Sequence, residues 1–293
     1  MQKPTQTEKE RNTTMSPARE RSTTRMMQKQ LTTAVVAAAF ALGLAANGRG
    51  QTPPADSPEG TKAILLRMAE FIATNSFTVD VRDNYDVYQE SGQKIEFNES
   101  RKITLIRPDR LRIEAEESDG QKQVLTFNGQ DLTLATLDKK VYAQTPKSGN
   151  LDDAIVFFVR DLGLRIPFAL LLKSTAPEEM VRRTTSLDYV EKTKIFGTPA
   201  HHLALRTATV DYQVWIADGD RPLPLRLVLT YPGSEGQPEF RAQFSNWTFS
   251  PKVAASKFTF VPSPGMQRIS FLAQLPWSVT NTASEDNKSN SPK

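Results

Sequence analysis

Two different periodicities of apolar residues follow each other along the chain after residue 57. Apolar residues at helical spacing begin behind Ser57-Pro58-Glu59, which is typical of a helix start because serine caps the helix and proline fits its first turn. We expect this helix to end near Asn75. From Phe77 the period changes to two, which predicts β-strands separated by turns. The helical stripe consists of Ile64, Leu65, Met68, Phe71 and Ile72.

The alternating region falls into two sets of strands. Short breaks, most of which contain Gly or Pro, separate neighbouring strands, and loops this short make the neighbours antiparallel. Eleven antiparallel strands are compatible with a sandwich, a closed barrel or an incomplete barrel. Six strands are expected at 77–90, 94–107, 110–118, 122–128, 131–136 and 140–144, and five more at 186–196, 199–207, 209–217, 221–231 and 239–249.

Residues 147–184 interrupt the alternation between the sixth and seventh strands. A helix is expected from Asn150 to Gly163, a second one from Pro167 and a short third one from Pro177. The first two are apolar over most of their circumference. Such helices are buried on several sides, or they face something apolar that is not part of the protein.

The first fifty residues predict a secretory signal peptide. A long basic stretch precedes the uncharged run 31–46, and small residues follow it. The alternative is a membrane anchor, but this Ala-rich run is short for a helix that spans a bilayer. We therefore expect a signal peptide with a long basic n-region at 1–50, a flexible lead-in at 51–57, one domain at 58–275 and a disordered polar tail at 276–293.

The charge belongs to the same N-terminal segment. The chain has a net charge of +4, but residues 1–50 carry eight Lys or Arg and three Asp or Glu, so the rest is close to neutral. The basicity therefore gives no reason to expect nucleic acid as a partner. The chain has no cysteine, which excludes disulfides, thiolate sites and a cysteine-linked lipid anchor. We expect a periplasmic protein that is soluble after signal cleavage.

Few residues suggest catalysis or metal binding. His201 and His202 are adjacent on a predicted strand and point to opposite faces, so they do not chelate one metal together. We expect one of them at the surface and the other partly buried. Asp80 and Asp86 share one strand face and Asp83 lies on the other, which we interpret as a solvated strand. We expect no metal, no cofactor and no catalysis, and a hydrolase is the least favoured alternative.

Apolar surface remains as the main functional signal. The C-terminal strands carry aromatic residues on both faces, and such a sheet needs cover on each of them. An apolar cavity between a curved sheet and the inserted helices would bind a hydrophobic ligand, and an ordinary two-layer core would give the same periodicity. The residues expected to line such a cavity are Phe157, Phe158, Phe168, Leu171, Val214, Leu225, Leu227 and Phe244.

The layout and several C-terminal motifs resemble the LolA/LolB lipoprotein-carrier superfamily. The motifs are Trp215-Ile216-Ala217-Asp218, Pro222-Leu223-Pro224, Phe244-Ser245-Asn246-Trp247 and the segment 258–265, Phe-Thr-Phe-Val-Pro-Ser-Pro-Gly. More narrowly, the chain resembles a family of predicted periplasmic proteins within that superfamily, domain-of-unknown-function family 2092. The resemblance covers about residues 58–272 and implies an open half-barrel lidded by helices. It brings no catalytic residues, and the missing cysteine separates the chain from LolB, which is a lipoprotein.

These observations lead to one expected fold and two expected functions. The fold class is α+β, a single domain with about eleven antiparallel strands in a curved open sheet, an N-terminal helix and a helical insert between strands six and seven. The expected function is binding or carriage of a lipid-like or acylated ligand in the periplasm, with transient membrane contact. The alternative is an envelope interaction or stress-sensor module that acts through a protein partner.

Overall fold

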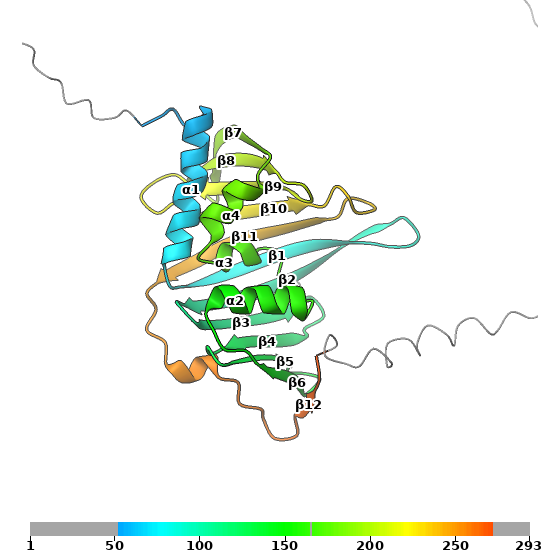
Figure 1. Ribbon diagram of the computed structural model, residues 1–293. Helices are drawn as coiled ribbons and strands as arrows, with labels where there is room; N and C mark the ends of the chain where they lie inside the picture. The colour runs from blue at the N-terminus through cyan, green and yellow to red at the C-terminus, as the bar shows by residue number, and fades with distance from the viewer. Residues whose placement is uncertain (1–51, 165, 272–293) are drawn as a thin grey trace, which may run out of the picture. The chain divides into compact units, whose positions relative to one another are not determined.

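The computed structural model describes residues 52–164 and 166–271 (Figure 1). The predictions of a signal peptide at 1–50 and of a polar tail at 276–293 lie outside the described residues. Within the described part of the chain, no helix is long and apolar enough to cross a membrane.

One open sheet of twelve strands forms the body of the fold. Its order in the described residues is β12-β6-β5-β4-β3-β2-β1-β11-β10-β9-β8-β7, so β12 and β7 are its edge strands there and the sheet does not close. The eleven predicted strands are confirmed to within three residues at each end. The strands are β1 (Phe77–Tyr88), β2 (Lys94–Ile106), β3 (Arg110–Glu117), β4 (Lys122–Phe127), β5 (Asp131–Thr136), β6 (Val141–Pro146), β7 (Ser186–Ile195), β8 (Thr198–Arg206), β9 (Asp211–Ala217), β10 (Pro224–Thr230), β11 (Glu239–Phe249) and β12 (Gln267–Ile269).

The sheet consists of two antiparallel meanders that meet at a central seam. Strands β1 to β6 form one meander and β7 to β11 the other, and the seam is the antiparallel pair β1–β11, in which Val81 lies opposite Phe244. This arrangement places β6 and β7 far apart, near opposite edges. The chain between them must therefore cross the sheet, and this crossing is the helical insert.

Helices cover one face of the sheet, which we call the inner face; the opposite one is the outer face (Figure 1). The Ser57 side chain caps the first helix by accepting a hydrogen bond from the Gly60 N–H at 3.0 Å. Asn150 caps the second in the same way, through the Asp153 N–H at 2.9 Å. The helices on this face are α1 (Pro58–Thr74), α2 (Leu151–Val156), the π-helical turn η1 (Phe157–Asp161), α3 (Ala169–Leu172) and α4 (Ala176–Arg183).

Two details differ from the sequence prediction. The twelfth strand, β12, pairs in parallel with β6, and its three residues are all exposed, so no hydrophobic alternation announces it. It follows the 3₁₀ turn η2 (Ala255–Phe258). In β10 the register shifts between Pro224 and Arg226, so Leu225 lies at an irregularity and does not continue the alternation of the strand.

Candidate functional site

The hydrophobic core lies between the helical insert and the inner face of the sheet. From the insert, Phe158 has an exposed fraction of 0%, Phe168 of 2% and Leu171 of 6%. They pack in one buried cluster with Val214, Leu227 and Phe244 of the sheet, and Phe157 borders this cluster. Leu225 is only partly buried and is not in the cluster. The structure therefore brings together seven of the eight residues predicted to line a cavity, and it packs six of them as buried core.

The insert is irregular for a helical element. Its longest helix has eight residues, and the turn that continues α2 is π-helical. Gly163 follows with a φ of +68°, a left-handed conformation that favours glycine. Short and irregular helices have few internal hydrogen bonds, so packing onto the sheet holds the insert in place.

Arg107 fastens the insert to the first helix. Its Nη2 donates hydrogen bonds to the carbonyl oxygens of Ile72 and Leu172, each at 3.1 Å, and its Nε donates to that of Asn75 at 3.2 Å. Two of these carbonyls lie at the C-terminal end of α1, where a cation is favourable, and the third ends α3. Burial lowers the pKa of Arg107, but a guanidinium stays charged in proteins. One side chain thus latches α3 onto α1.

Asp152 connects the first turn of α2 to the segment between α3 and α4. Its carboxylate accepts hydrogen bonds from the Ser174 N–H and hydroxyl, both at 2.8 Å, and from the Thr175 N–H at 3.3 Å. Burial alone would raise the pKa of Asp152, but these hydrogen bonds hold it below its ordinary value. The insert is therefore tied together internally as well as latched to α1.

A charged group lies on the inner face beside this apolar cluster. The side chain of Asp83 has no exposed surface, and the Arg101 Nε lies 3.1 Å from its Oδ2. Arg101 also pairs with Glu99 through Nη2, and its guanidinium carbon lies 5.6 Å from the ring centre of Phe168. Burial raises the pKa of Asp83 to about 7, against the attraction of Arg101.

The interpretation of the aspartate set as a solvated strand is therefore wrong for Asp83, and also for Asp86, whose side chain is 3% exposed; it holds for Asp80, which is 38% exposed. The three aspartates do alternate as predicted, because Asp80 and Asp86 lie on the outer face and Asp83 on the inner one. Asp83 shares its face with the buried Val79 and Val81, so the insert covers it. Asp83 occupies the same alternate positions of the strand as Val79 and Val81, and this was the sequence signal that could have predicted its burial.

The two histidines have structural partners. They point to opposite faces as predicted, but neither is at the surface, since their side chains are 13% and 10% exposed. His201 Nδ1 lies 3.1 Å from the Tyr189 hydroxyl, and its Nε2 lies 3.2 Å from Asp218 Oδ1. His202 stacks on Trp215, with ring centres 4.0 Å apart. The expectation of one surface histidine is wrong because the aromatic neighbours on β7 and β9 cover both rings.

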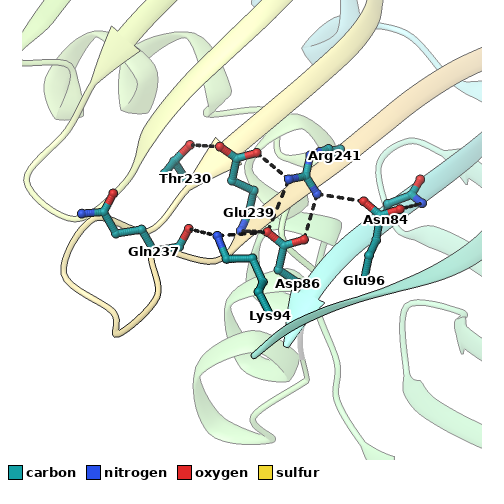
Figure 2. Close-up of polar contacts among 8 residues, drawn as sticks. All are labelled: Asn84, Asp86, Lys94, Glu96, Thr230, Gln237, Glu239 and Arg241. Atoms are coloured by element: carbon teal, nitrogen blue, oxygen red, sulfur yellow. Dashed lines mark hydrogen bonds and ion pairs between the residues drawn. The ribbon is translucent and has the colours of Figure 1, made fainter. Parts of the chain in front are cut away.

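An ion-pair cluster on the outer face strengthens the central seam (Figure 2). Asp86 of β1 is 3% exposed and accepts two hydrogen bonds from Arg241 of β11, at 2.9 and 3.3 Å. Arg241 also pairs with Glu96 of β2 at 3.1 Å and with Glu239 at 2.7 Å. Lys94 lies 3.7 Å from Asp86. Despite burial, these partners hold the pKa of Asp86 below its ordinary value. We call this group the seam clamp.

A hollow of about 730 Å³ opens on the outer face rather than under the insert. Polar side chains of β1 to β4 and β11 line most of it, Arg82 and Glu116 among them. Phe196 at the β7–β8 turn is part of its rim and is 84% exposed. This hollow does not have the apolar lining that the sequence predicted.

Comparison with known protein families identifies one family that this chain matches. A sequence-family profile described as "Predicted periplasmic protein (DUF2092)" matches residues 61–272. No curated protein matches the chain.

Several solved structures are similar to this one at low identity. The Pseudomonas aeruginosa MucA/MucB complex shares 16% identity over 68% of this chain and 60% of that one, with a TM-score of 0.38. This chain thus spans about 60% of that chain's length. The Mycobacterium tuberculosis lipoprotein LppX shares 13% sequence identity, with 67% of this chain and 99% of that chain covered and a TM-score of 0.43. A LolA superfamily protein from Nitrosomonas europaea shares 10% sequence identity, with 68% of this chain and 97% of that chain covered and a TM-score of 0.35.

Proposed function

The chain belongs to the DUF2092 family of predicted periplasmic proteins, and from this premise we propose that it is exported to the periplasm and binds an apolar ligand between the insert and the inner face of the sheet. In the described structure the insert occupies that place itself. The ligand enters when the insert lifts, and its apolar chain replaces the side chains of Phe158, Phe168 and Leu171. We expect no catalysis.

The observation that supports this proposal is that the insert, which covers the inner face, consists of short and irregular helices. Besides α1, short helices cover the apolar inner face, one of them π-helical. Of the three hydrogen bonds that Arg107 donates, one holds α3, through the Leu172 carbonyl, and two go to the end of α1. Elements held by few hydrogen bonds and by packing open more easily than the sheet beneath them. The part of the insert from α2 to the start of α4 can move as one piece because Asp152 holds α2 to Ser174.

The free energy lost when side chains of the insert become exposed is comparable to the free energy gained when an acyl chain is buried in their place. Exposing the side chains of Phe158, Phe168 and Leu171, which the ligand replaces, costs about 2 kcal/mol each, and burying an acyl chain returns about 0.8 kcal/mol per methylene. A chain of about eight methylenes therefore offsets the exposure of these three side chains. This estimate favours long-chain lipids over small apolar molecules.

The test is binding of an uncharged apolar dye, N-phenyl-1-naphthylamine, to the mature protein, together with native mass spectrometry of the protein purified without detergent. We expect dye fluorescence to rise on binding, a lipid to displace the dye, and a lipid-sized mass to accompany the protein. Absence of both dye binding and a co-purified lipid would refute the proposal.

The second candidate function is an interaction module that acts through an envelope protein. The exposed aromatic ring of Phe196 favours it. This residue lies at a hairpin turn with a φ of +48°, a strained conformation for a bulky residue, and at the rim of the outer hollow. A pull-down from envelope extract that recovers a stoichiometric partner, lost in Phe196→Ser, and no lipid in the mass spectrum would favour this candidate over carriage.

A further inference from the structure

The buried charged group on the inner face is incompletely satisfied. Neither carboxylate oxygen of Asp83 has a hydrogen-bond partner among the described residues, and neither does the Arg101 Nε, although the two side chains form an ion pair. Both side chains are more than nine-tenths buried. Buried polar groups without hydrogen bonds are costly and call for a physical explanation, such as a ligand that completes them.

Acidic residues outnumber basic ones at this place. Asp83 of β1, Glu99 of β2 and Glu117 of β3 lie directly opposite one another in register, so three carboxylates form a row across the inner face. Like charges in such a row destabilise a sheet. Arg101 pairs with two of the three, and one guanidinium does not neutralise three carboxylates.

Aromatic rings border the same row. Tyr85 and Phe97 stack beside it with ring centres 5.8 Å apart, and Phe97 is 38% exposed. Burial, together with the charges of Glu117 and Glu99, raises the pKa of the Tyr85 hydroxyl, as expected in a negative surrounding. Carboxylates beside aromatic faces are the environment that binds ammonium groups. No group of three acidic or histidine side chains in the described ranges is placed to hold a metal ion.

The ring of Phe168, from the insert, packs beside this place. Phe168 lies 5.9 Å from the ring of Phe244, 6.1 Å from that of Phe240 and 5.6 Å from the Arg101 guanidinium. These residues flank Asp83 in the register of β1 with β2 and β11. When the insert lifts, the ring of Phe168 leaves the carboxylates open to the incoming ligand.

We propose that the ligand is an amphipath with an ammonium head group, which binds to the carboxylate row at Asp83 while its apolar chain lies along the inner face. This proposal rests on the proposed function, because it names the class of ligand for the same site. The ammonium N–H groups donate hydrogen bonds to the two free oxygens of Asp83, and the charge offsets the excess of carboxylates. A carboxylate or phosphate head group meets repulsion at the same place.

The experiment compares amphipaths of equal chain length as competitors for N-phenyl-1-naphthylamine at pH 8, below their micelle-forming concentrations. We expect dodecylammonium to displace the dye at a concentration about tenfold lower than dodecanoate, which corresponds to one favourable charge contact. In Asp83→Asn this ratio should fall to about twofold or less, since the variant keeps the shape and removes the charge. Asp80→Asn is the matched control, because Asp80 lies on the same strand but on the outer face, and its ratio should stay at the wild-type value.

Each outcome decides one question. Dodecanoate that competes as well as dodecylammonium, or a ratio that Asp83→Asn leaves unchanged, would overturn the ammonium assignment while the proposed function stands. Absence of dye binding together with absence of a co-purified lipid would overturn both. If Asp83→Asn fails to fold, Glu99→Gln replaces it with the same expected loss of preference.

Discussion

Asp83→Asn should make the protein more stable at neutral pH and remove part of its pH dependence. The folded protein holds the pKa of Asp83 at about 7, against an ordinary value of 3.8. Between these two values the folded state binds more protons than the unfolded state, so stability falls as the pH rises through this window and is constant above it. The difference of about three pKa units corresponds to about 4 kcal/mol. Asparagine imitates the protonated acid, so the variant does not lose this energy.

The assay is urea unfolding followed by tryptophan fluorescence, from pH 4 to pH 8.5, for the wild type and the variant. The difference in unfolding free energy should be close to zero near pH 4 and should grow to about 4 kcal/mol in favour of Asp83→Asn at pH 8, a shift of roughly 10 °C in Tm. Asp80→Asn should stay within about 0.5 kcal/mol of the wild type at each pH, because its side chain is 38% exposed on the outer face. Parallel pH curves for wild type and Asp83→Asn would refute the reasoning.

Three further predictions concern the core, the latch and the seam. Phe158→Ala should cost about 3–5 kcal/mol in urea unfolding because a fully buried ring leaves a cavity, and a cost below about 1 kcal/mol would contradict a packed interface under the insert. Arg107→Met should speed N-phenyl-1-naphthylamine binding in stopped flow, because it removes three hydrogen bonds from the insert and α1. The control is Arg67→Met, whose side chain bonds only the Gly219 carbonyl in the described structure and which should leave the rate unchanged. Equal binding rates for the two variants would argue against a role of Arg107 in holding the insert. Arg241→Met should lower the unfolding free energy by about 3 kcal/mol because it leaves the buried Asp86 carboxylate without its main partner, and unchanged stability would show that the seam clamp contributes little.

The strands were predictable because each strand carries its own alternation. The positions of β1 to β11 follow from period-two patterns and short turns, and the cap at Ser57 follows from local chemistry. The pairing of β1 with β11 was not predictable, since periodicity does not show which distant strands are neighbours. The short exposed β12 carries no pattern at all.

The candidate site was predictable only in part. Phe158, Phe168 and Leu171 were identified because the insert is apolar around its circumference, and this requires burial. The burial of Asp83 was missed because alternation gives the two faces of a strand but not which face is covered. The position of Leu225 was missed because an irregular register shifts the pattern by one residue without a clear sequence mark.

The central claim is that a ligand takes the place of the insert on the inner face, and hydrogen exchange with and without N-phenyl-1-naphthylamine tests it most directly. With saturating dye, amides of the insert at 151–164 and 169–183 should exchange faster, while those of β1 and β11 should be unchanged or slower, because the insert lifts and the sheet stays paired. Dye that binds without any change in exchange at the insert would place the ligand elsewhere and contradict the account.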